Sequence, residues 1–267
     1  MRAPAVQEFM PKVIITIPCF NESNRLPVAE IVEELSANGD MGLCFVDDGS
    51  RDNTMEVLES IRKQFPDRVL VVSLGQNRGK AEAVRTGILR SIETFNPELV
   101  GFLDADLATP FEEIERLLES AERFRHVVMF SGCRVRRLGA YIDRLWWRHY
   151  LGRVFATAAS ISLGLPVYDT QCGAKIFRAE EAAGLFERPF SSRWIFDVEI
   201  FARVAKRWGA KQATERIMEV PLQTWKDRQG SKVRLTSFVT AFFDLLKIHR
   251  EYHRNDRSHR EAHPCRR

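Results

Sequence analysis

The chain has 267 residues, 45% of them hydrophobic and 28% charged, which is typical of one large α/β domain or two small ones. Its formal net charge of +4 is too small to indicate nucleic acid as a partner. The five cysteines are scattered and form no Cys-x-x-Cys pair, which argues against a disulfide framework or a zinc site.

The sequence shows neither a secretion signal at its start nor an apolar run long enough to span a bilayer. Its longest uncharged run covers residues 154–168 and is rich in small residues. We therefore expect a cytoplasmic protein that is either soluble or peripheral on the cytosolic face of a membrane.

Residues 12–131 alternate between apolar β-branched runs and amphipathic segments. Strands are expected at 12–18, 43–47, 69–73, 99–104 and 127–131, and helices at 27–37, 53–65, 81–95 and 110–124. Asp52 is expected to cap the second helix, and Thr109, Pro110 and Glu112 read as a capping box for the fourth. The alternation predicts an α/β fold with a Rossmann-like, mostly parallel sheet flanked by helices.

The alternation stops after Gly132, and the elements become less regular. We expect, in order, a polar loop at 169–175 leading into a short strand, helices at 178–185 and 197–208, a strand at 217–222, a charged loop at 225–232 and an amphipathic helix at 235–249. No repeat or low-complexity linker interrupts the chain, so we expect a single domain over residues 1–249. The basic segment 250–267 has almost no apolar residues and is expected to be a disordered tail.

Two carboxylates, Asp104 and Asp106, follow the fourth expected strand. In extended backbone, residues two apart point to the same side, so the pair can hold one hard cation such as Mg²⁺ or Mn²⁺. The alternative is that Asp106 only helps to cap the next helix.

Other loops at the same edge of the expected sheet carry Glu22, Asp47 and Asp48, together with the cation Lys80. Neither a Gly-x-Gly-x-x-Gly fingerprint nor a P-loop is present, which disfavours nicotinamide enzymes and ordinary nucleotide triphosphatases. Carboxylates suit ribose, base N–H groups and a metal, whereas the metal and basic residues suit a diphosphate. This combination favours a nucleotide-diphosphate donor.

Five motifs, in this order, resemble those of family 2 inverting glycosyltransferases with the GT-A fold. They are Pro18-Cys-Phe-Asn-Glu22, Val46-Asp-Asp-Gly-Ser50, Asn77-Arg-Gly-Lys80, Asp104-Ala-Asp106 and Ser131-Gly-Cys-Arg134. The segments 104–110 and 169–173 look most like those of dolichyl-phosphate β-glucosyltransferases, with the dolichyl-phosphate mannose synthases as close relatives. The resemblance covers residues 12–245.

The resemblance implies a role for each matching residue. The donor nucleotide sugar would be bound by Pro18, Phe20, Glu22, Val46, Asp48, Lys80, Asp104, Ala105 and Asp106. Asp104 and Asp106 would bracket the diphosphate and its Mg²⁺ or Mn²⁺. Asp106, Arg134 and Lys232 would be the catalytic residues, with Arg134 facing the sugar and phosphates. Ala108 departs from the mannose synthase pattern, which favours the glucosyl branch and leaves the metal shell less defined.

The implied reaction moves glucose from UDP-glucose to a polyprenyl or dolichyl phosphate. The acceptor phosphate is already ionised, so it needs no general base but does need cations and polar groups. The expected acceptor and phosphate contacts are Arg134, Arg136, Arg137, Gln171, Lys226 and Lys232. A hydroxyl acceptor would instead need a base, for which Asp197 and Glu199 are candidates, unless they only complement a helix N-terminus. GDP-mannose as donor and a non-catalytic nucleotide-sugar-binding scaffold stay open as alternatives.

The segment Arg134–Arg153 holds six arginines against one acid, Asp143, together with Trp and Tyr. We expect it to lie in a membrane interface, with arginine at lipid phosphates and the aromatic rings at headgroup level. The alternatives are an amphipathic helix packed on the sheet and an oligomer contact. A membrane partner subunit or a homo-oligomer is a further expectation.

Overall fold

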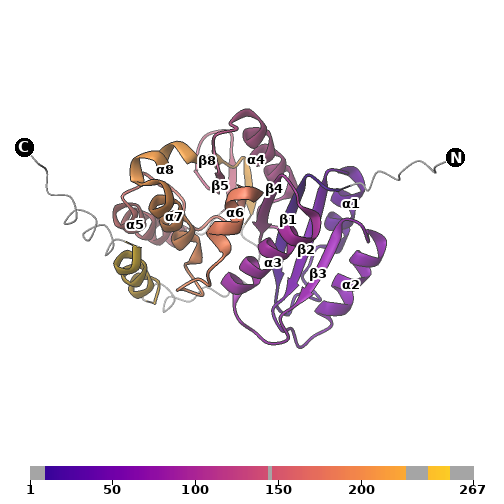
Figure 1. Cartoon of the computed structure of the whole chain (residues 1–267). Coiled ribbons are helices and arrows are strands. Elements are labelled where there is room, and N and C mark those ends of the chain that lie inside the picture. Colours follow the sequence, from indigo (N-terminus) through magenta and orange to yellow (C-terminus); the bar gives the residue numbers. More distant parts are fainter. Residues whose placement is uncertain (1–9, 144–145, 227–239, 253–267) are drawn as a thin grey trace, which may run out of the picture.

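A seven-stranded sheet forms the centre of the protein, seen in a computed structural model that describes residues 10–143, 146–226 and 240–252 (Figure 1). Its order is β3-β2-β1-β4-β7-β5-β8, and β7 runs antiparallel to both neighbours while the other pairs are parallel. The strands are β1 Val13–Cys19, β2 Met41–Asp47, β3 Val69–Ser73, β4 Leu99–Leu103, β5 Met129–Cys133, β7 Ala174–Arg178 and β8 Ile217–Pro221. The expected mostly parallel sheet is confirmed.

Helices cover both faces of this sheet. They are α1 Val28–Ala37, α2 Thr54–Gln64, α3 Lys80–Phe95, α4 Phe111–Arg123, α5 Trp146–Leu163, α6 Ala179–Phe186, α7 Phe196–Trp208, α8 Ala210–Arg216 and a helix at 240–252. A separate two-stranded parallel ribbon pairs β6 Tyr141–Asp143 with β9 Thr224–Lys226. In the described part of the chain, no helix is both long and apolar enough to cross a membrane.

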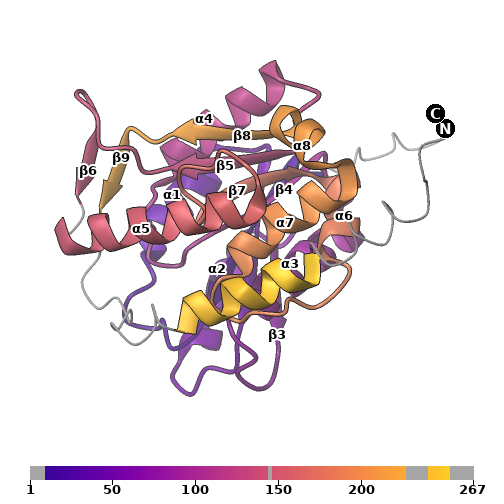
Figure 2. The same cartoon turned by 90° about the vertical axis from the view of Figure 1, so that its left-hand side faces the viewer.

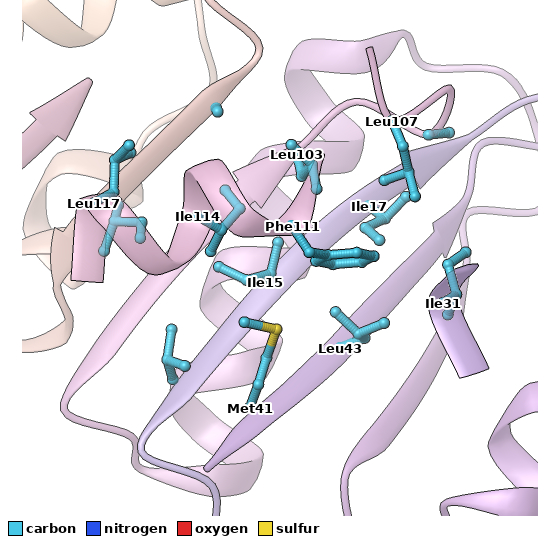
Figure 3. Close-up of a cluster of buried hydrophobic side chains, with 14 of the residues drawn as sticks. Ile15, Ile17, Ile31, Met41, Leu43, Leu103, Leu107, Phe111, Ile114 and Leu117 are labelled. Atoms are coloured by element: carbon cyan, nitrogen blue, oxygen red, sulfur yellow. The ribbon is translucent and has the colours of Figure 1, made fainter. Parts of the chain in front are cut away.

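Strand side chains alternate between two apolar layers, as a sheet covered on both faces requires. In β4, Leu103 joins the layer under α1, α2 and α4, whereas Phe102 joins the layer under α3, α5, α6 and α7. Figure 3 shows the first layer, where Phe111 and Ile114 of α4 pack over Ile15 of β1. The two layers hold the carboxyl ends of β1, β2 and β4 at one edge of the sheet.

The expected ends of three helices need correction. Thr109 does not cap α4, because the N-cap is Pro110 and no side chain bonds the first turn. The N-cap position of the second helix is Asn53, whose side chain makes no cap hydrogen bond, whereas Asp52 accepts a hydrogen bond from the Thr54 amide at 3.1 Å. The last helix reaches residue 252, so the segment expected as a tail from 250 is helical at its start. Residues 235–239 and 253–267 lie outside the described part.

Candidate active site

The Asp104–Asp106 pair lies in a turn directly after β4 rather than in extended backbone. The turn is closed by the Leu107 amide, which donates to the Asp104 carbonyl at 3.1 Å, and Leu107 has a φ of 47°. Asp106 is exposed, and its carboxylate accepts a hydrogen bond from the Ala108 amide at 3.0 Å. Ala108 lies three residues before the start of α4. Asp106 therefore orders this turn and faces solvent without capping the helix.

Asp104 is enclosed by residues from two other elements. Lys80, the first residue of α3, forms an ion pair with it. A Cβ built on Gly173 would lie 2.1 Å from its Oδ2 atom, so glycine alone allows this close approach. Burial lowers the pKa of Lys80, but the charges of Asp104, Asp197 and Asp106 outweigh it and raise this pKa above its ordinary value. Lys80 therefore stays protonated beside both carboxylates.

Asp48 connects the end of β2 to the loop before α3. Its carboxylate accepts hydrogen bonds from the amides of Arg78 at 2.6 Å and Gly79 at 2.9 Å. Burial raises the pKa of Asp48, although these two bonds act in the opposite direction. Since Gly79 precedes Lys80, Asp48 fixes the backbone that carries the cation to Asp104.

The loop after β1 is tied to the loop after β2. The Glu22 amide donates to Thr54 Oγ1 at 2.8 Å, and the Glu22 carboxylate pairs with Arg25. Pro18 and Phe20 are half-buried next to this loop. The loops that carry the first two motifs therefore form one connected rim along the carboxyl edge of the sheet.

The side chains of two residues expected at the nucleotide lie in the hydrophobic core. Val46 is fully buried and packs in a cluster with Ile14, Cys44 and Ala83. Ala105 is buried within the layer under α4. Val46 has no exposed surface and Ala105 is only 8% exposed.

Arg134 is paired with Asp169, a residue expected in a polar loop and in the family-like segment 169–173 but given no role of its own. Its Nε and Nη2 groups donate to the Asp169 carboxylate at 2.7 and 2.9 Å. Burial lowers the pKa of Arg134, but Asp169 raises it more strongly and Asp104 adds to the increase, so this pKa lies above its ordinary value. Asp169 begins the loop whose Gly173 lies against Asp104, so this loop links Arg134 to the carboxylate pair.

The remaining expected phosphate contacts are spread around this site. Lys226 is exposed at the end of β9. The Lys226 amide donates to the Ala108 carbonyl at 3.0 Å and so attaches the ribbon to the Asp104–Asp106 turn. Arg136 and Arg137 are exposed beside a shallow hollow that the 136–143 segment lines. Lys232 lies outside the described residues.

The side chain of Gln171 has an unused donor. Its Nε2 atom is buried and has no hydrogen-bond partner among the described residues. A buried amide normally finds a partner, so this donor is unsatisfied and an oxygen atom of a ligand would satisfy it. Its neighbour Cys172 is a core residue, because burial raises the pKa of the thiol to about 11 and keeps it protonated at neutral pH.

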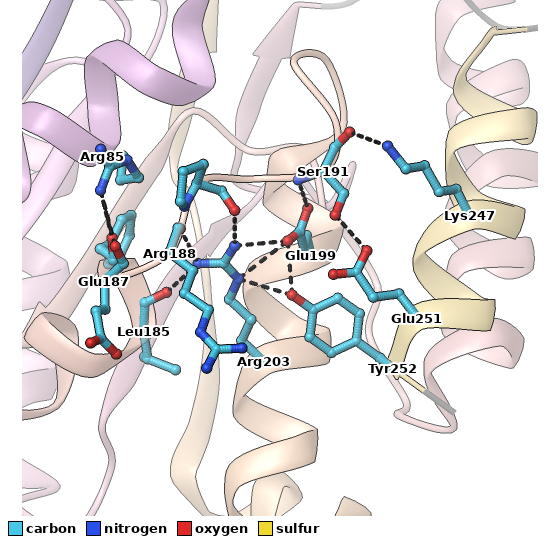
Figure 4. A network of polar contacts seen from close by, with 12 residues as sticks. Arg85, Leu185, Glu187, Arg188, Ser191, Glu199, Arg203, Lys247, Glu251 and Tyr252 are labelled. Atoms are coloured by element: carbon cyan, nitrogen blue, oxygen red, sulfur yellow. Dashed lines mark hydrogen bonds and ion pairs between the residues drawn. The ribbon is translucent and has the colours of Figure 1, made fainter. Parts of the chain in front are cut away.

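Asp197 and Glu199 are used inside the protein. Asp197 accepts a hydrogen bond from Lys175 Nζ at 2.6 Å. Glu199 accepts hydrogen bonds from Arg203 and Tyr252, both at 2.8 Å, in the network drawn in Figure 4. Both carboxylates are buried, so the structural interpretation of these residues is favoured over a role as general base.

The donor set suits a divalent cation that shares its shell with a substrate. Asp104 and Asp106 supply hard carboxylate oxygens, the ligands that Mg²⁺ and Mn²⁺ prefer. Among the described residues no group of three or more His, Cys, Asp or Glu side chains is placed to hold a metal. Two carboxylates leave positions for phosphate oxygens and water, which is the usual arrangement for Mg²⁺ at a nucleotide.

Comparisons with known proteins agree with this geometry. The family model described as "Glycosyl transferase family 2" matches residues 14–183. A dolichyl-phosphate beta-glucosyltransferase of Trichomonas vaginalis is 30% identical over 262 residues, which cover 92% of this chain and 74% of the relative. Its counterpart from Mus musculus is 31% identical over 253 residues, covering 89% and 75%. That from Saccharomyces cerevisiae is 28% identical over 260 residues, covering 89% and 74%.

Solved structures with the same fold include glucosyl-3-phosphoglycerate synthase from Mycobacterium tuberculosis, at a TM-score of 0.63 and 18% identity over 91% of this chain and 80% of that chain. The same enzyme with Mn²⁺, UDP-glucose and phosphoglyceric acid bound gives a TM-score of 0.62 at 18% identity, over 90% and 80%. The expected GT-A architecture is confirmed. The chain therefore belongs to glycosyl transferase family 2 and is a glycosyltransferase, as its five motifs predict.

Proposed function

We propose that this glycosyltransferase moves glucose from UDP-glucose to dolichyl phosphate or another polyprenyl phosphate at the cytosolic face of a membrane. One observation carries the proposal: Lys80 pairs with Asp104, and the loop that holds Arg134 through Asp169 also places Gly173 against Asp104. The names of the relatives, dolichyl-phosphate beta-glucosyltransferases, support glucose as the sugar and a lipid phosphate as acceptor. Ala108, which departs from the mannose synthase pattern, supports UDP-glucose over GDP-mannose.

The reaction displaces a nucleoside diphosphate from the anomeric carbon, so negative charge grows on the leaving oxygens. A divalent cation bound by Asp104 and Asp106 would neutralise part of this charge. Lys80 stays protonated beside them and contributes a fixed positive charge. Arg134, which Asp169 holds at the start of the loop whose Gly173 lies against Asp104, would add a second cation.

The acceptor side needs no general base, because a lipid phosphate is already an anionic nucleophile at neutral pH. Asp197 and Glu199 are both engaged in buried ion pairs, which agrees with this requirement. The unpartnered Nε2 of Gln171 offers a donor to a sugar or phosphate oxygen near Arg134. Arg136, Arg137 and Lys226 are exposed cations that can attract the acceptor phosphate.

The membrane contact is better assigned to two helices, α5 and the helix at 240–252, than to the whole Arg134–Arg153 segment. Arg153 points inward: it donates to the Tyr168 carbonyl at 2.8 Å, and its guanidinium lies 3.6 Å from the Tyr168 ring centre. The described exposed side chains of α5 are instead all uncharged, namely Tyr150, Leu151, Val154, Thr157 and Ile161. The side chains of Arg144 and Arg148 lie outside the description.

The helix at 240–252 adds exposed apolar side chains next to this surface, although its later residues Lys247, Arg250 and Glu251 are exposed and charged. Phe242 contacts Phe155 of α5 with ring centres 5.8 Å apart, and His249 contacts Ser162, so the two helices run side by side (Figure 2). The exposed Phe243 and Leu246 lie on the second helix. Two adjacent helices with exposed apolar side chains suit the interfacial region of a bilayer.

Replacing Val154 and Ile161 together by serine is expected to weaken binding to phosphatidylcholine vesicles by at least about tenfold, because less apolar surface enters the bilayer. Both side chains are exposed, at 60% and 77%, so folding should be unaffected. Met10→Ser, which removes an exposed apolar side chain elsewhere, serves as the control in a vesicle flotation assay. Equal flotation of the double variant and the wild type would argue against this interface.

The Gly173→Ala variant is expected to lower transfer by at least about tenfold, because its methyl group would displace the Asp104 carboxylate from its position. Gly184→Ala is the control, since its Cβ would meet only the flexible end of Arg207. Initial rates of glucosyl transfer at saturating donor concentration compare the two variants. Full activity of Gly173→Ala would mean that the position of Asp104 is unimportant.

The proposed function is tested by incubating the protein with labelled UDP-glucose, Mn²⁺ and polyprenyl phosphate, and by measuring label in the lipid phase. We expect lipid-soluble label from UDP-glucose and much less from GDP-mannose. Label from GDP-mannose alone would favour the mannosyl alternative. No label from either donor, with tight UDP binding retained, would favour a nucleotide-sugar-binding scaffold.

A further inference from the structure

The Arg134–Asp169 ion pair is sequestered at the edge of the active site. Both side chains are 10% exposed, and the carboxylate also accepts a hydrogen bond from the Arg134 amide at 3.1 Å. The bonds from Nε and Nη2, at 2.7 and 2.9 Å, use both oxygens and fix the plane of the guanidinium. Arg134 is therefore oriented before any ligand arrives.

Asp169 is itself fixed from two directions. Glu219 of β8 accepts hydrogen bonds from the amides of Asp169 at 2.7 Å and Tyr168 at 2.8 Å. Arg153 of α5 holds Tyr168 from the other side, at its carbonyl and its ring. The position of the Asp169 carboxylate is thus set by a strand and a helix that make no described contact with Asp104.

The opposite edge of the Arg134 guanidinium keeps hydrogen-bonding capacity that no described residue uses. No described residue forms a hydrogen bond with Nη1, and the ring of Trp225 lies 5.3 Å from Cζ. Asp169, which holds Arg134, begins the loop whose Gly173 lies against the Asp104 carboxylate. This loop therefore places the guanidinium next to the site of the carboxylate pair.

We propose that Asp169 is a positioning residue that acts through Arg134. By binding one edge of the guanidinium, it presents the other edge to a phosphate oxygen in a preformed orientation. A side chain ordered in advance loses no further conformational freedom during the reaction. The inference rests on the proposed function in one respect: it assumes that this phosphate belongs to a substrate of the transfer reaction.

The test compares Asp169→Asn, Arg134→Gln and the double variant. Asp169→Asn is expected to lower kcat roughly 10- to 100-fold while the KM for the nucleotide sugar changes by less than about threefold. The double variant should be no slower than Arg134→Gln if Asp169 acts on transfer through Arg134, because asparagine keeps an oxygen for the backbone amide of Gln171, which donates to the Asp169 carboxylate at 3.1 Å. Losses that multiply in the double variant would show an independent role for Asp169 and overturn the proposal.

The control uses a matched ion pair outside the site. Glu82 binds Nε and Nη2 of Arg85, both at 2.8 Å, in the same two-pronged manner. Glu82→Gln is expected to leave kcat unchanged, alone or combined with Arg134→Gln. Circular dichroism and melting curves verify folding; if Asp169→Asn does not fold, Glu219→Gln tests the same chain of contacts with the same expected non-additivity.

A second measurement needs no enzymatic activity. The rate at which phenylglyoxal modifies Arg134, followed by peptide mass spectrometry, should rise at least fivefold in Asp169→Asn, while exposed Arg51 reacts as before. An unchanged rate at Arg134 would overturn the positioning role. A wild-type protein without transferase activity would instead overturn the proposed function and leave this readout intact.

Discussion

Asp106→Asn is expected to lower kcat for glucosyl transfer by about two to three orders of magnitude, because the metal that neutralises the leaving diphosphate loses a charged ligand. The asparagine oxygen can still accept the hydrogen bond from the Ala108 amide, so the turn after β4 should stay folded. Asp106 is exposed and no core contact is lost. Initial rates with saturating UDP-glucose and Mn²⁺ measure the effect.

Asp67→Asn is the matched control for this variant. Asp67 is an exposed aspartate just before β3, at the opposite edge of the sheet from the active site. Its replacement removes the same charge and should leave kcat unchanged. If Asp106→Asn retained wild-type activity with an unchanged melting curve, Asp106 would have no role at the metal.

The Lys175→Met variant is expected to lose about 3–5 kcal/mol of the free energy of unfolding, because it leaves a buried carboxylate without its partner. Lys175 is fully buried on β7, and its Nζ donates to Asp197 at 2.6 Å, to the Cys172 carbonyl at 2.6 Å and to the Thr170 carbonyl at 3.1 Å. The ion pair therefore connects the 169–173 loop to the first turn of α7. Urea denaturation measures the loss.

Two further variants separate the buried charge from general packing. Lys175→Met combined with Asp197→Leu should be more stable than Lys175→Met alone, because the unpaired charge is removed. Lys12→Met, which breaks the exposed pair with Asp40, should have no measurable effect. A double variant less stable than the single one would contradict the assigned cause.

The sheet was predictable because each of its parallel strands is an apolar run followed by a polar loop. Ile14, Ile15 and Ile17 are all fully buried, as expected for a strand covered on both faces. The place of β7 between β4 and β5 was not predictable. Its neighbours in the sheet lie far away in the sequence, and no local pattern encodes the antiparallel pairing of Phe102 with Lys175.

The small ribbon and α8 escaped prediction for a different reason. β6 and β9 have three residues each, and their pairing of Ile142 with Trp225 depends on tertiary contacts. Glu113 shows the same limit: a residue in the first turn of α4 uses its carboxylate to accept the amides of Gln223 and Thr224, at 3.0 and 2.7 Å. Such long-range roles leave no periodic signal in the sequence.

The candidate site was predictable as a set of motifs but only partly as a geometry. Asp104, Asp106 and Lys80 come together as the carboxyl-edge rule implies. The partner of Arg134 was missed, since Asp169 lies 35 residues further along the chain and its motif 169–173 gives no sign of which residue it binds. The roles of the nucleotide-binding and acceptor residues stay predictions.

The central claim is that a divalent cation, held by Asp104 and Asp106, joins the protein to the diphosphate of its donor. Calorimetric titration with UDP in Mn²⁺ and again in EDTA tests this claim most directly. We predict binding at least about a hundredfold tighter in Mn²⁺, and no such difference in the Asp104→Asn/Asp106→Asn variant. Equal UDP affinity with and without the metal in the wild-type protein would contradict the account.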